Sequence, residues 1–288
     1  MTLAADGAAP RGEVVLRDVS KSYGPERFAT QVVRNCSFLA PAQKFTIVIG
    51  PSGVGKSTLI RLIAGFEKPT RGEILIDGRP VTGPARDRLV VFQETALFPW
   101  MTTERNILFG PRARGEDSGT SAKRADFLLE KVGLRAFRKH FPSQLSGGMQ
   151  RRAELARALI NNPDVMILDE PFRGLDALTK KLMLDYYARL SLEQPRTNLF
   201  VTTDIDEAIF LADRLLVMSH IPTHVREVID VDLPRPRNFT ALFQDNRANA
   251  IKMAVLSLLH EEAMKGFAGG RRAASDFIES YRRRVAAA

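Results

Sequence analysis

The chain has 288 residues, 44% hydrophobic and 26% charged, which is enough to fold around a large core with an appended segment. Its formal net charge of +9 is scattered without interleaved aromatic residues, so we expect no nucleic-acid partner. No apolar run reaches the ~18 residues of a membrane span, the N-terminus does not resemble a secretory signal, and the one cysteine, Cys36, cannot form an internal disulfide. These features predict a globular protein of a reducing cytoplasm.

The predicted elements begin after a flexible N-terminus at residues 1–12. EVVLRDVS and GEILIDG carry charges at their flanks and predict a small antiparallel sheet, and Cys36 is expected in a buried strand. Five continuous apolar runs then predict parallel strands that are buried on both faces: FTIVIG, LVVFQ, VMILDE, LFVTT and LLVMS. Helical segments separate these runs, so the predicted fold class is α/β with a mostly parallel sheet.

Two further segments lie outside this sheet. Residues from about 94 to 160 read as a helical subdomain whose helices are joined by the linker PRARGEDSGTS. Residues 225–288 read as a tail with a strand, VREVIDVDL, one or two helices, a break at Gly269 and Gly270, and a basic end, RRAASDFIESYRRRV. That end is expected to be solvated, and contact with anionic lipid is the alternative. The side chains expected to pack the tail on the core are Leu242, Phe243, Ile251, Val255 and Leu258.

The segment GPSGVGKST, from Gly50 to Thr58, lies between a predicted strand and a predicted helix. In this order, backbone N–H groups and the positive helix end meet phosphate oxygens. Lys56 would reach the β- and γ-phosphates, Ser57 would place its hydroxyl on Mg²⁺, and Thr58 would lie near the α-phosphate. A chance glycine turn is the alternative. The other nucleotide-binding residues expected in this loop are Gly50, Pro51, Ser52, Gly53, Val54 and Gly55.

The run VMILDE places two carboxylates at the carboxyl end of a predicted strand, where open α/β sheets bind ligands. Asp169 would hold Mg²⁺ through water, and Glu170 would polarise the attacking water. Further upstream, LSGGMQRRAELARAL begins a helix at which Ser146 is a good N-cap. Its glycines predict a second anion-binding helix start, which would serve a phosphate on another subunit, and a plain glycine-rich cap is the alternative.

Together these motifs resemble those of the ATP-binding-cassette (ABC) ATPases, in the family's order, over roughly the first three quarters of the chain. SKSYG, VFQE, LSGGMQ, ILDEPF and RGLDALT resemble the family's aromatic loop, glutamine loop, signature, acidic strand and the loop whose Asp176 crosses the dimer interface. The resemblance implies an ATPase domain at 13–224 with ATP and Mg²⁺ as cofactors. It also implies that Tyr23 stacks on adenine and that Gln93 contacts Mg²⁺ and senses the transporter.

By the same resemblance, the active unit is a head-to-tail dimer of this chain with a second copy or a homologous subunit. Each ATP would lie between one phosphate loop and the other copy's signature residues. Transmembrane permease subunits are the expected partners, a periplasmic solute-binding protein acts indirectly, and the subunit is expected at the cytoplasmic face of the cell membrane as a peripheral protein. The signature residues expected to contact ATP are Ser146, Gly147, Gly148 and Gln150.

A narrower resemblance concerns the transported solute. ETALFPWMTTERNILFG and TTDIDEAIFLADRLLVMS resemble importer ATPases of the nitrate, sulfonate and taurine type. Phe98 and Trp100 would line the groove that receives the permease, and a place in the core of the helical subdomain is the alternative. A lipid-type ABC transporter remains open. A soluble cassette acting on DNA or ribosomes would normally carry a coiled-coil insertion or a second cassette, and this sequence has neither.

Two positions depart from the family pattern. Thr203 stands where these ATPases normally have a histidine that contacts the γ-phosphate, and Arg173 stands where a small residue is usual. A threonine hydroxyl donates one hydrogen bond but cannot become cationic. We therefore expect ATP binding to survive and turnover to be slow, so a nucleotide-gated scaffold that hydrolyses ATP slowly or not at all is the alternative function.

Overall fold

The computed structural model describes the backbone of residues 10–286, and its side chains except those of Glu26, Phe243 and residues 267–286. Most of the predicted N-terminal segment, the packing of Phe243 and the basic side chains of the C-terminal end therefore lie outside the described residues. Within the described part, no helix combines the length and the apolar character needed to cross a bilayer.

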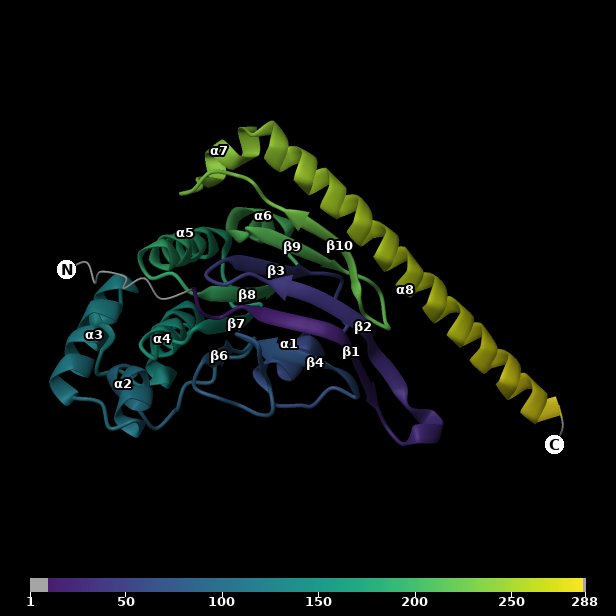
Figure 1. Ribbon diagram of the computed structural model, residues 1–288, viewed down its shortest axis with the longest axis horizontal. Helices are drawn as coiled ribbons and strands as arrows, with labels where there is room; N and C mark the ends of the chain where they lie inside the picture. Colours follow the sequence, from purple (N-terminus) through teal and green to yellow (C-terminus); the bar gives the residue numbers. More distant parts are fainter. Residues whose placement is uncertain (1–9, 287–288) are drawn as a thin grey trace.

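The core contains a six-stranded sheet in the order β10-β9-β3-β8-β7-β6 (Figure 1). All neighbouring pairs are parallel except β10 with β9, so the predicted mostly parallel sheet is confirmed. In chain order the strands are β3 (Phe45–Ile49), β6 (Arg88–Val91), β7 (Val165–Asp169), β8 (Thr197–Thr202), β9 (Arg214–Met218) and β10 (Val225–Asp230).

The predicted antiparallel sheet is also present, with four strands in the order β2-β1-β4-β5. Cys36 lies fully buried in β2, as predicted. The strands are β1 (Val14–Tyr23), β2 (Thr30–Ala40), β4 (Arg71–Ile76) and β5 (Arg79–Pro80).

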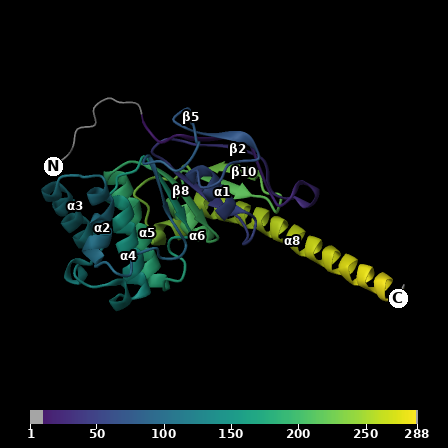
Figure 2. The same cartoon turned by 90° about the horizontal axis from the view of Figure 1, so that it is seen from below.

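Helices cover both faces of the parallel sheet. Val48, Ile167 and Leu216 point toward α1 and the antiparallel sheet, whereas Ile47 and Leu168 point toward the α5 and α6 side. The helices α2, α3 and α4 form a block at one end of the sheet (Figures 1 and 2). The α-helices up to this point are α1 (Lys56–Ala64), α2 (Thr103–Ala113), α3 (Ser118–Lys131), α4 (Gly147–Leu159), α5 (Ala177–Glu193) and α6 (Ile205–Leu211). The short 3₁₀ turns are η1 (Glu26–Phe28), η2 (Arg135–Phe137) and η3 (Pro142–Gln144).

The linker PRARGEDSGTS is shorter than predicted. Helix α2 continues through Pro111 to Ala113, and α3 already begins at Ser118, where the Asp117 side chain accepts a hydrogen bond from the Thr120 N–H. Pro111 has no N–H to donate to the Ile107 carbonyl, yet the helix continues two residues beyond it. The connection is therefore confined to residues 114–117.

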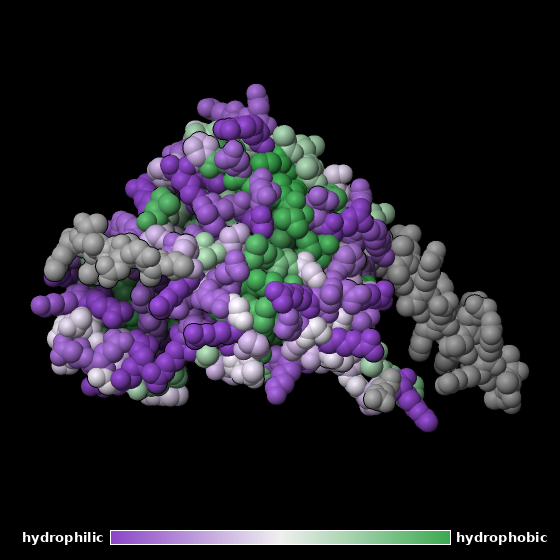
Figure 3. All heavy atoms as spheres, in the orientation of Figure 1, coloured by the Kyte–Doolittle hydropathy of each residue, from purple (hydrophilic) through white to green (hydrophobic). Residues whose placement is uncertain are grey.

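The tail forms β10, a short helix α7 (Phe239–Gln244) and a long helix α8 (Asn246–Ala286), which runs along the edge of the molecule and extends past it (Figure 1). The predicted break at Gly269 and Gly270 is wrong, because α8 continues through both glycines. Val255 is fully buried, and Leu242, Ile251 and Leu258 pack against the core as predicted. Figure 3 shows an apolar band beside α8, over the region of β10 and β2, within a largely hydrophilic surface.

Candidate functional site

The phosphate loop leaves β3 at Ile49 and enters α1 at Lys56. Gly53 and Gly55 have φ of +79° and +97°, a region that disfavours residues with a Cβ. A Cβ on Gly55 would also lie 2.9 Å from Val32 Cγ1. The loop therefore needs glycine at these positions in order to expose its N–H groups ahead of the helix.

Lys56 is held beneath this loop. Its ammonium group donates to the carbonyl oxygens of Gly50 at 2.8 Å and Pro51 at 2.7 Å, and the residue is 6% exposed. Burial lowers its pKa, the carboxylates of Glu170 and Asp169 oppose that effect, and the charge of Arg173 adds to it. A cation that is already desolvated and oriented in this way is suited to bind a phosphate.

The three predicted Mg²⁺ ligands lie together. Ser57 Oγ donates to Asp169 Oδ2 at 3.1 Å, and both residues line, with Gln93, a cavity of about 440 Å³. Burial raises the pKa of Asp169, the Ser57 hydrogen bond opposes that effect, and the charge of Glu170 adds to it. Hydroxyl, carboxylate and amide oxygens are the donor set that Mg²⁺ prefers, with phosphate and water completing its shell, so these residues fit the ion.

Glu170 follows β7 in a left-handed conformation, with φ of +43°. Its N–H donates to the Val201 carbonyl at 2.9 Å, which fixes the turn against β8. Its carboxylate forms an ion pair with Arg173, with Nη1 and Oε2 at 3.0 Å. Sequence reasoning noticed Arg173 as a departure but missed this contact, because the contact depends on the shape of the turn.

Thr203 lies in the turn between β8 and α6, and it is exposed. Among the described residues its hydroxyl forms no hydrogen bond, whereas the hydroxyl of Thr202 donates to Glu207 Oε2 at 2.6 Å. Lys180 bridges Asp204 and Glu207 at 2.8 Å each. The groups around Thr203 thus hold one another in place, and Thr203 itself remains available at the carboxyl edge of the sheet.

The pKa values of these three groups are shifted: those of Glu207 and Lys180 are raised and that of Asp204 is lowered. Burial raises the pKa of Glu207, and the hydrogen bonds from Lys180 and Thr202 oppose that effect. At Asp204 burial also acts upward, but the hydrogen bond from Lys180 and backbone N–H groups outweigh it and lower the pKa. At Lys180 burial is likewise outweighed, by its bonds to both carboxylates, so its pKa is raised and it stays charged.

Tyr23 is 36% exposed at the end of β1. Its hydroxyl donates to Glu67 Oε2 at 2.6 Å, and the ammonium group of Lys21 lies 5.0 Å from its ring centroid. The ring is therefore fixed near α1, where the sequence predicts adenine stacking. Thr58, also predicted in the site, lies next to the Tyr23 hydroxyl.

The signature residues lie at the start of α4. Ser146 caps this helix by accepting from the Met149 N–H at 3.3 Å. A Cβ on Gly147 would meet no atom within 4 Å, and a Cβ on Gly148 would make only ordinary contacts, the nearest at 3.5 Å. Neither glycine has a positive φ. The fold of one chain therefore does not require glycine at either position. The absence of a side chain leaves room for another molecule to approach the backbone closely.

Gln150 points into its own chain, where its amide donates to the carbonyls of Pro142 at 2.9 Å and Leu145 at 3.2 Å. Its predicted ATP contact stays a prediction. In the described residues no hydrogen bond joins the signature to the phosphate loop of the same copy. The signature and the phosphate loop therefore stand as separate surfaces.

A buried ion pair that the sequence did not reveal links the signature helix to the glutamine loop. Arg151 pairs with Glu154 at 2.6 Å and donates to the carbonyls of Phe92, at 2.7 Å, and Gln93. Glu154 in turn accepts from the Ala96 N–H at 3.1 Å. The start of α4 and the Gln93 loop are consequently positioned by the same two side chains.

An aromatic group precedes and enters α2. Phe98 is half-buried, with its ring 4.7 Å from that of Phe109 and 5.6 Å from that of Trp100. Trp100 is 69% exposed, so it does not belong to the core of the helical block.

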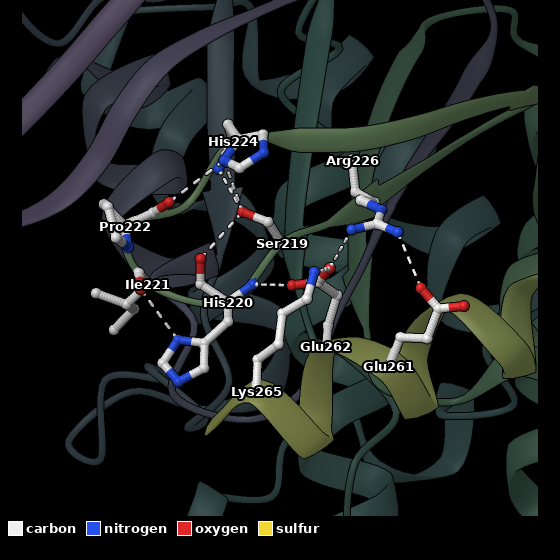
Figure 4. Close-up of polar contacts among 9 residues, drawn as sticks. All are labelled: Ser219, His220, Ile221, Pro222, His224, Arg226, Glu261, Glu262 and Lys265. Atoms are coloured by element: carbon white, nitrogen blue, oxygen red, sulfur yellow. Dashed lines mark hydrogen bonds and ion pairs between the residues drawn. The ribbon is translucent and has the colours of Figure 1, made fainter. Parts of the chain in front are cut away.

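Glu262 of α8 contacts the loop between β9 and β10 (Figure 4). Its carboxylate is 1% exposed, pairs with Arg226 at 2.9 Å and Lys265, and accepts from the His220 N–H at 2.8 Å. In the same loop, three residues after His220, the Thr223 hydroxyl donates to the Val54 carbonyl of the phosphate loop. The loop between β9 and β10 thus connects α8 to the nucleotide site, and no sequence motif indicated it.

Comparisons with known proteins agree with this geometry. The family described as "ABC transporter" matches residues 33–173. The chain is 40% identical to an uncharacterised ABC transporter ATP-binding protein of Methanocaldococcus jannaschii, over 77% of this chain and 82% of that protein. It is 39% identical to the aliphatic sulfonates import ATP-binding protein SsuB of Bacillus licheniformis, over 82% and 92% respectively.

Solved structures give the same result. A dimeric, post-hydrolysis state of an ATP-binding cassette bound to ADP and Pi is similar to 77% of this chain and to that whole chain. The two share 31% sequence identity with a TM-score of 0.67. With the phosphate loop, the acidic strand and the signature in place, this chain belongs to the ABC transporter ATP-binding proteins, a family that hydrolyses ATP.

Proposed function

We propose that this subunit energises the import of a small anion, such as a sulfonate, taurine or nitrate, through a membrane permease. The observation that carries the proposal is the likeness to aliphatic sulfonate import ATP-binding proteins across 92% of the length of one of them. In this proposal the subunit lies at the cytoplasmic face of the cell membrane, and residues 13–224 form the ATPase domain.

The residues at the carboxyl edge of the sheet support specific roles in hydrolysis. Lys56 and the loop N–H groups bind the β- and γ-phosphates. Ser57, Asp169 and Gln93 hold Mg²⁺, which neutralises phosphate charge when bound. Glu170 accepts a proton from the water whose oxygen bonds to the γ-phosphorus. The bond to the β,γ-bridging oxygen breaks, and its electron pair leaves with ADP.

Two features support a head-to-tail dimer as the active unit. In the described residues the signature makes no hydrogen bond with its own phosphate loop, and Gly147 and Gly148 leave room for a close approach. One solved cassette of 31% identity is dimeric with ADP and Pi bound. We infer that each ATP lies between the phosphate loop of one copy and Ser146, Gly147 and Gly148 of the other, with Tyr23 stacked on adenine.

The aromatic group of Phe98, Trp100 and Phe109 is the surface we assign to the permease. The exposed Trp100 ring lies against Phe98, whose ring packs in turn against Phe109, and an exposed tryptophan with such support is typical of a protein interface. The group lies beside the Gln93 loop, and Arg151 of the signature helix donates a hydrogen bond to that loop. The proposed permease surface and the proposed nucleotide contacts are therefore connected through Arg151.

Reconstitution into liposomes with a candidate permease and its binding protein tests the proposal. We expect ATP-driven uptake of a radiolabelled sulfonate when the binding protein is present, and no uptake with the Glu170→Gln subunit. ATP-driven movement of phospholipid without any sulfonate uptake would instead support a lipid-type transporter. The exposed Thr203 favours a second candidate, a slow nucleotide-gated clamp, which ATP turnover well below the uptake demand would reveal.

A further inference from the structure

Arg173 occupies a turn that brings its side chain back to the catalytic carboxylate. Glu170 and Gly174 have φ of +43° and +79°, and the Arg173 N–H donates to the Glu170 carbonyl at 3.1 Å. Between them, Phe172 is 1% exposed and its ring lies 5.8 Å from that of Phe200. The turn is therefore anchored in the core while Arg173 projects from it.

The ion pair does not explain why an arginine stands here. The Arg173 side chain is 60% exposed, whereas that of Glu170 is 12% exposed. A pair with one such exposed partner contributes little to stability, because water screens the attraction. The Glu170 N–H and the buried Phe172 already hold the turn. A weak, half-exposed pair is readily exchanged for another anion.

The other cations near the site already have a role or a partner. Lys56 is held by two loop carbonyls, where it serves the phosphate loop itself, and Lys180 bridges Asp204 and Glu207. Arg61, which lines the Ser57 and Asp169 cavity, pairs with Glu67 at 3.6 Å. Thr203, at the end of the adjacent strand, has no positive charge to offer. Arg173 is thus the cation that pairs with Glu170 itself, and its charge contributes to lowering the pKa of Lys56.

We propose that Arg173 is a catalytic residue that supplies the cationic γ-phosphate contact missing at position 203. When ATP binds, the guanidinium exchanges the Glu170 carboxylate for γ-phosphate oxygens, which its planar donors can bind in pairs. The exchange also releases Glu170 to accept the proton of the attacking water. As the bond between the γ-phosphorus and the bridging oxygen breaks, Arg173 stabilises the charge on the transferred group.

The inference rests on ATP hydrolysis by this site, and steady-state kinetics of Arg173→Ala and Arg173→Lys test it. We expect Arg173→Ala to lower kcat by about 10²-fold, the scale of one preorganised donor, with a much smaller change in KM. Arg173→Lys should keep part of the rate. Arg189→Ala is the matched control, because Arg189 forms an exposed pair with Asp185 at 2.9 Å on α5, and its turnover should be unchanged.

Two rescue measurements separate catalysis from loop structure. Free guanidinium ion at a non-denaturing concentration should restore part of the Arg173→Ala rate, and so should Thr203→His in the same background. An Arg173→Ala variant that matches or exceeds wild-type turnover overturns the inference, as does a loss that neither addition restores. A wild-type chain that binds ATP without hydrolysing it overturns the ATPase assignment as well, which distinguishes the two failures.

Discussion

At the scale of single residues, nucleotide binding depends most directly on Lys56. Replacing it by Ala removes the one side-chain cation that the loop supplies, while the loop glycines keep their backbone conformation. A hydrogen bond to a charged group contributes about 1.5–3 kcal/mol, so we expect ATP affinity to fall by about 10-fold to 100-fold. Calorimetry with Mg²⁺ present measures the change, with Lys131→Ala, on the exposed surface of α3, as the control. Equal affinities for wild type and Lys56→Ala would contradict the phosphate-loop assignment.

The residues of the phosphate loop and the acidic strand could be placed from the sequence, because short spacing and a flanking strand fix their geometry. Ser57 and Asp169 are far apart in the chain but meet because both follow parallel strands at the same edge. The pairing of Arg173 with Glu170 could not be predicted. It depends on a left-handed backbone conformation at Glu170, which the sequence pattern does not predict.

At the scale of elements, the segment leading into α2 carries the surface that we assign to the permease. Trp100→Ala should leave basal ATP hydrolysis unchanged within about twofold, because among the described residues its side chain contacts Phe98 and none of the residues assigned to the nucleotide. It should weaken binding to the permease by about 10-fold or more, as expected of a tryptophan hot spot. Co-purification and surface binding to the solubilised permease give the comparison. Phe28→Ala, at another exposed aromatic residue, is the control. Permease binding that is unchanged by Trp100→Ala would refute the assignment.

Glu262 adds a polar attachment to the apolar contacts that hold helix α8 on the core, so replacing Glu262 should lower the stability of the protein. Glu262→Ala leaves the His220 N–H, Arg226 and Lys265 without their shared acceptor, and we expect a loss of about 1–3 kcal/mol in the free energy of unfolding. Urea unfolding measures it. Glu261→Ala is the matched control, since Glu261 is half exposed and contacts only Arg226 among the described residues.

The same carboxylate predicts a pH dependence. Burial alone would raise the pKa of Glu262, but hydrogen bonds from Lys265 and the His220 N–H, with the charges of Lys265 and Arg226, lower it. Its stabilisation is therefore fully present above the ordinary glutamate pKa of about 4.3 and is lost as the pH falls through the lower folded value. Unfolding of wild type and Glu262→Ala between pH 7 and pH 3 should converge at acid pH. A constant difference would show that the charge of Glu262 is not involved.

The sequence predicted which helices and strands are present more accurately than where each of them ends. The parallel strands are recognisable because continuous apolar runs have few alternatives. Gly269 and Gly270 led to the wrong prediction of a break in α8. Each glycine destabilises a helix by only about 1 kcal/mol, and the surrounding helix formers offset that cost. The connection between α2 and α3 was overestimated because Pro111, which usually marks the end of a helix, lies inside α2.

At the scale of the whole molecule, the phosphate loop and the signature, which we propose bind one ATP from two different copies, do not meet within the described part of one copy. The phosphate loop, Asp169 and Glu170 lie at the carboxyl edge of the parallel sheet, whereas Ser146 caps a helix of the separate helical block (Figure 2). The sequence led to the prediction that the signature serves another subunit because the chain already has one phosphate loop. The arrangement of the second copy follows from neither the sequence nor one chain's packing.

The most direct test of this account is the mass of the Glu170→Gln protein by light scattering with and without ATP and Mg²⁺. The substitution removes the base while keeping the phosphate contacts, so ATP should persist and hold two 32.0 kDa chains together. Adding Gly148→Asp, which places a charge at the signature, should leave ATP binding intact and abolish the dimer. A Glu170→Gln protein that binds ATP yet stays monomeric at saturation, or a double variant that still dimerises, would contradict a site shared between phosphate loop and signature.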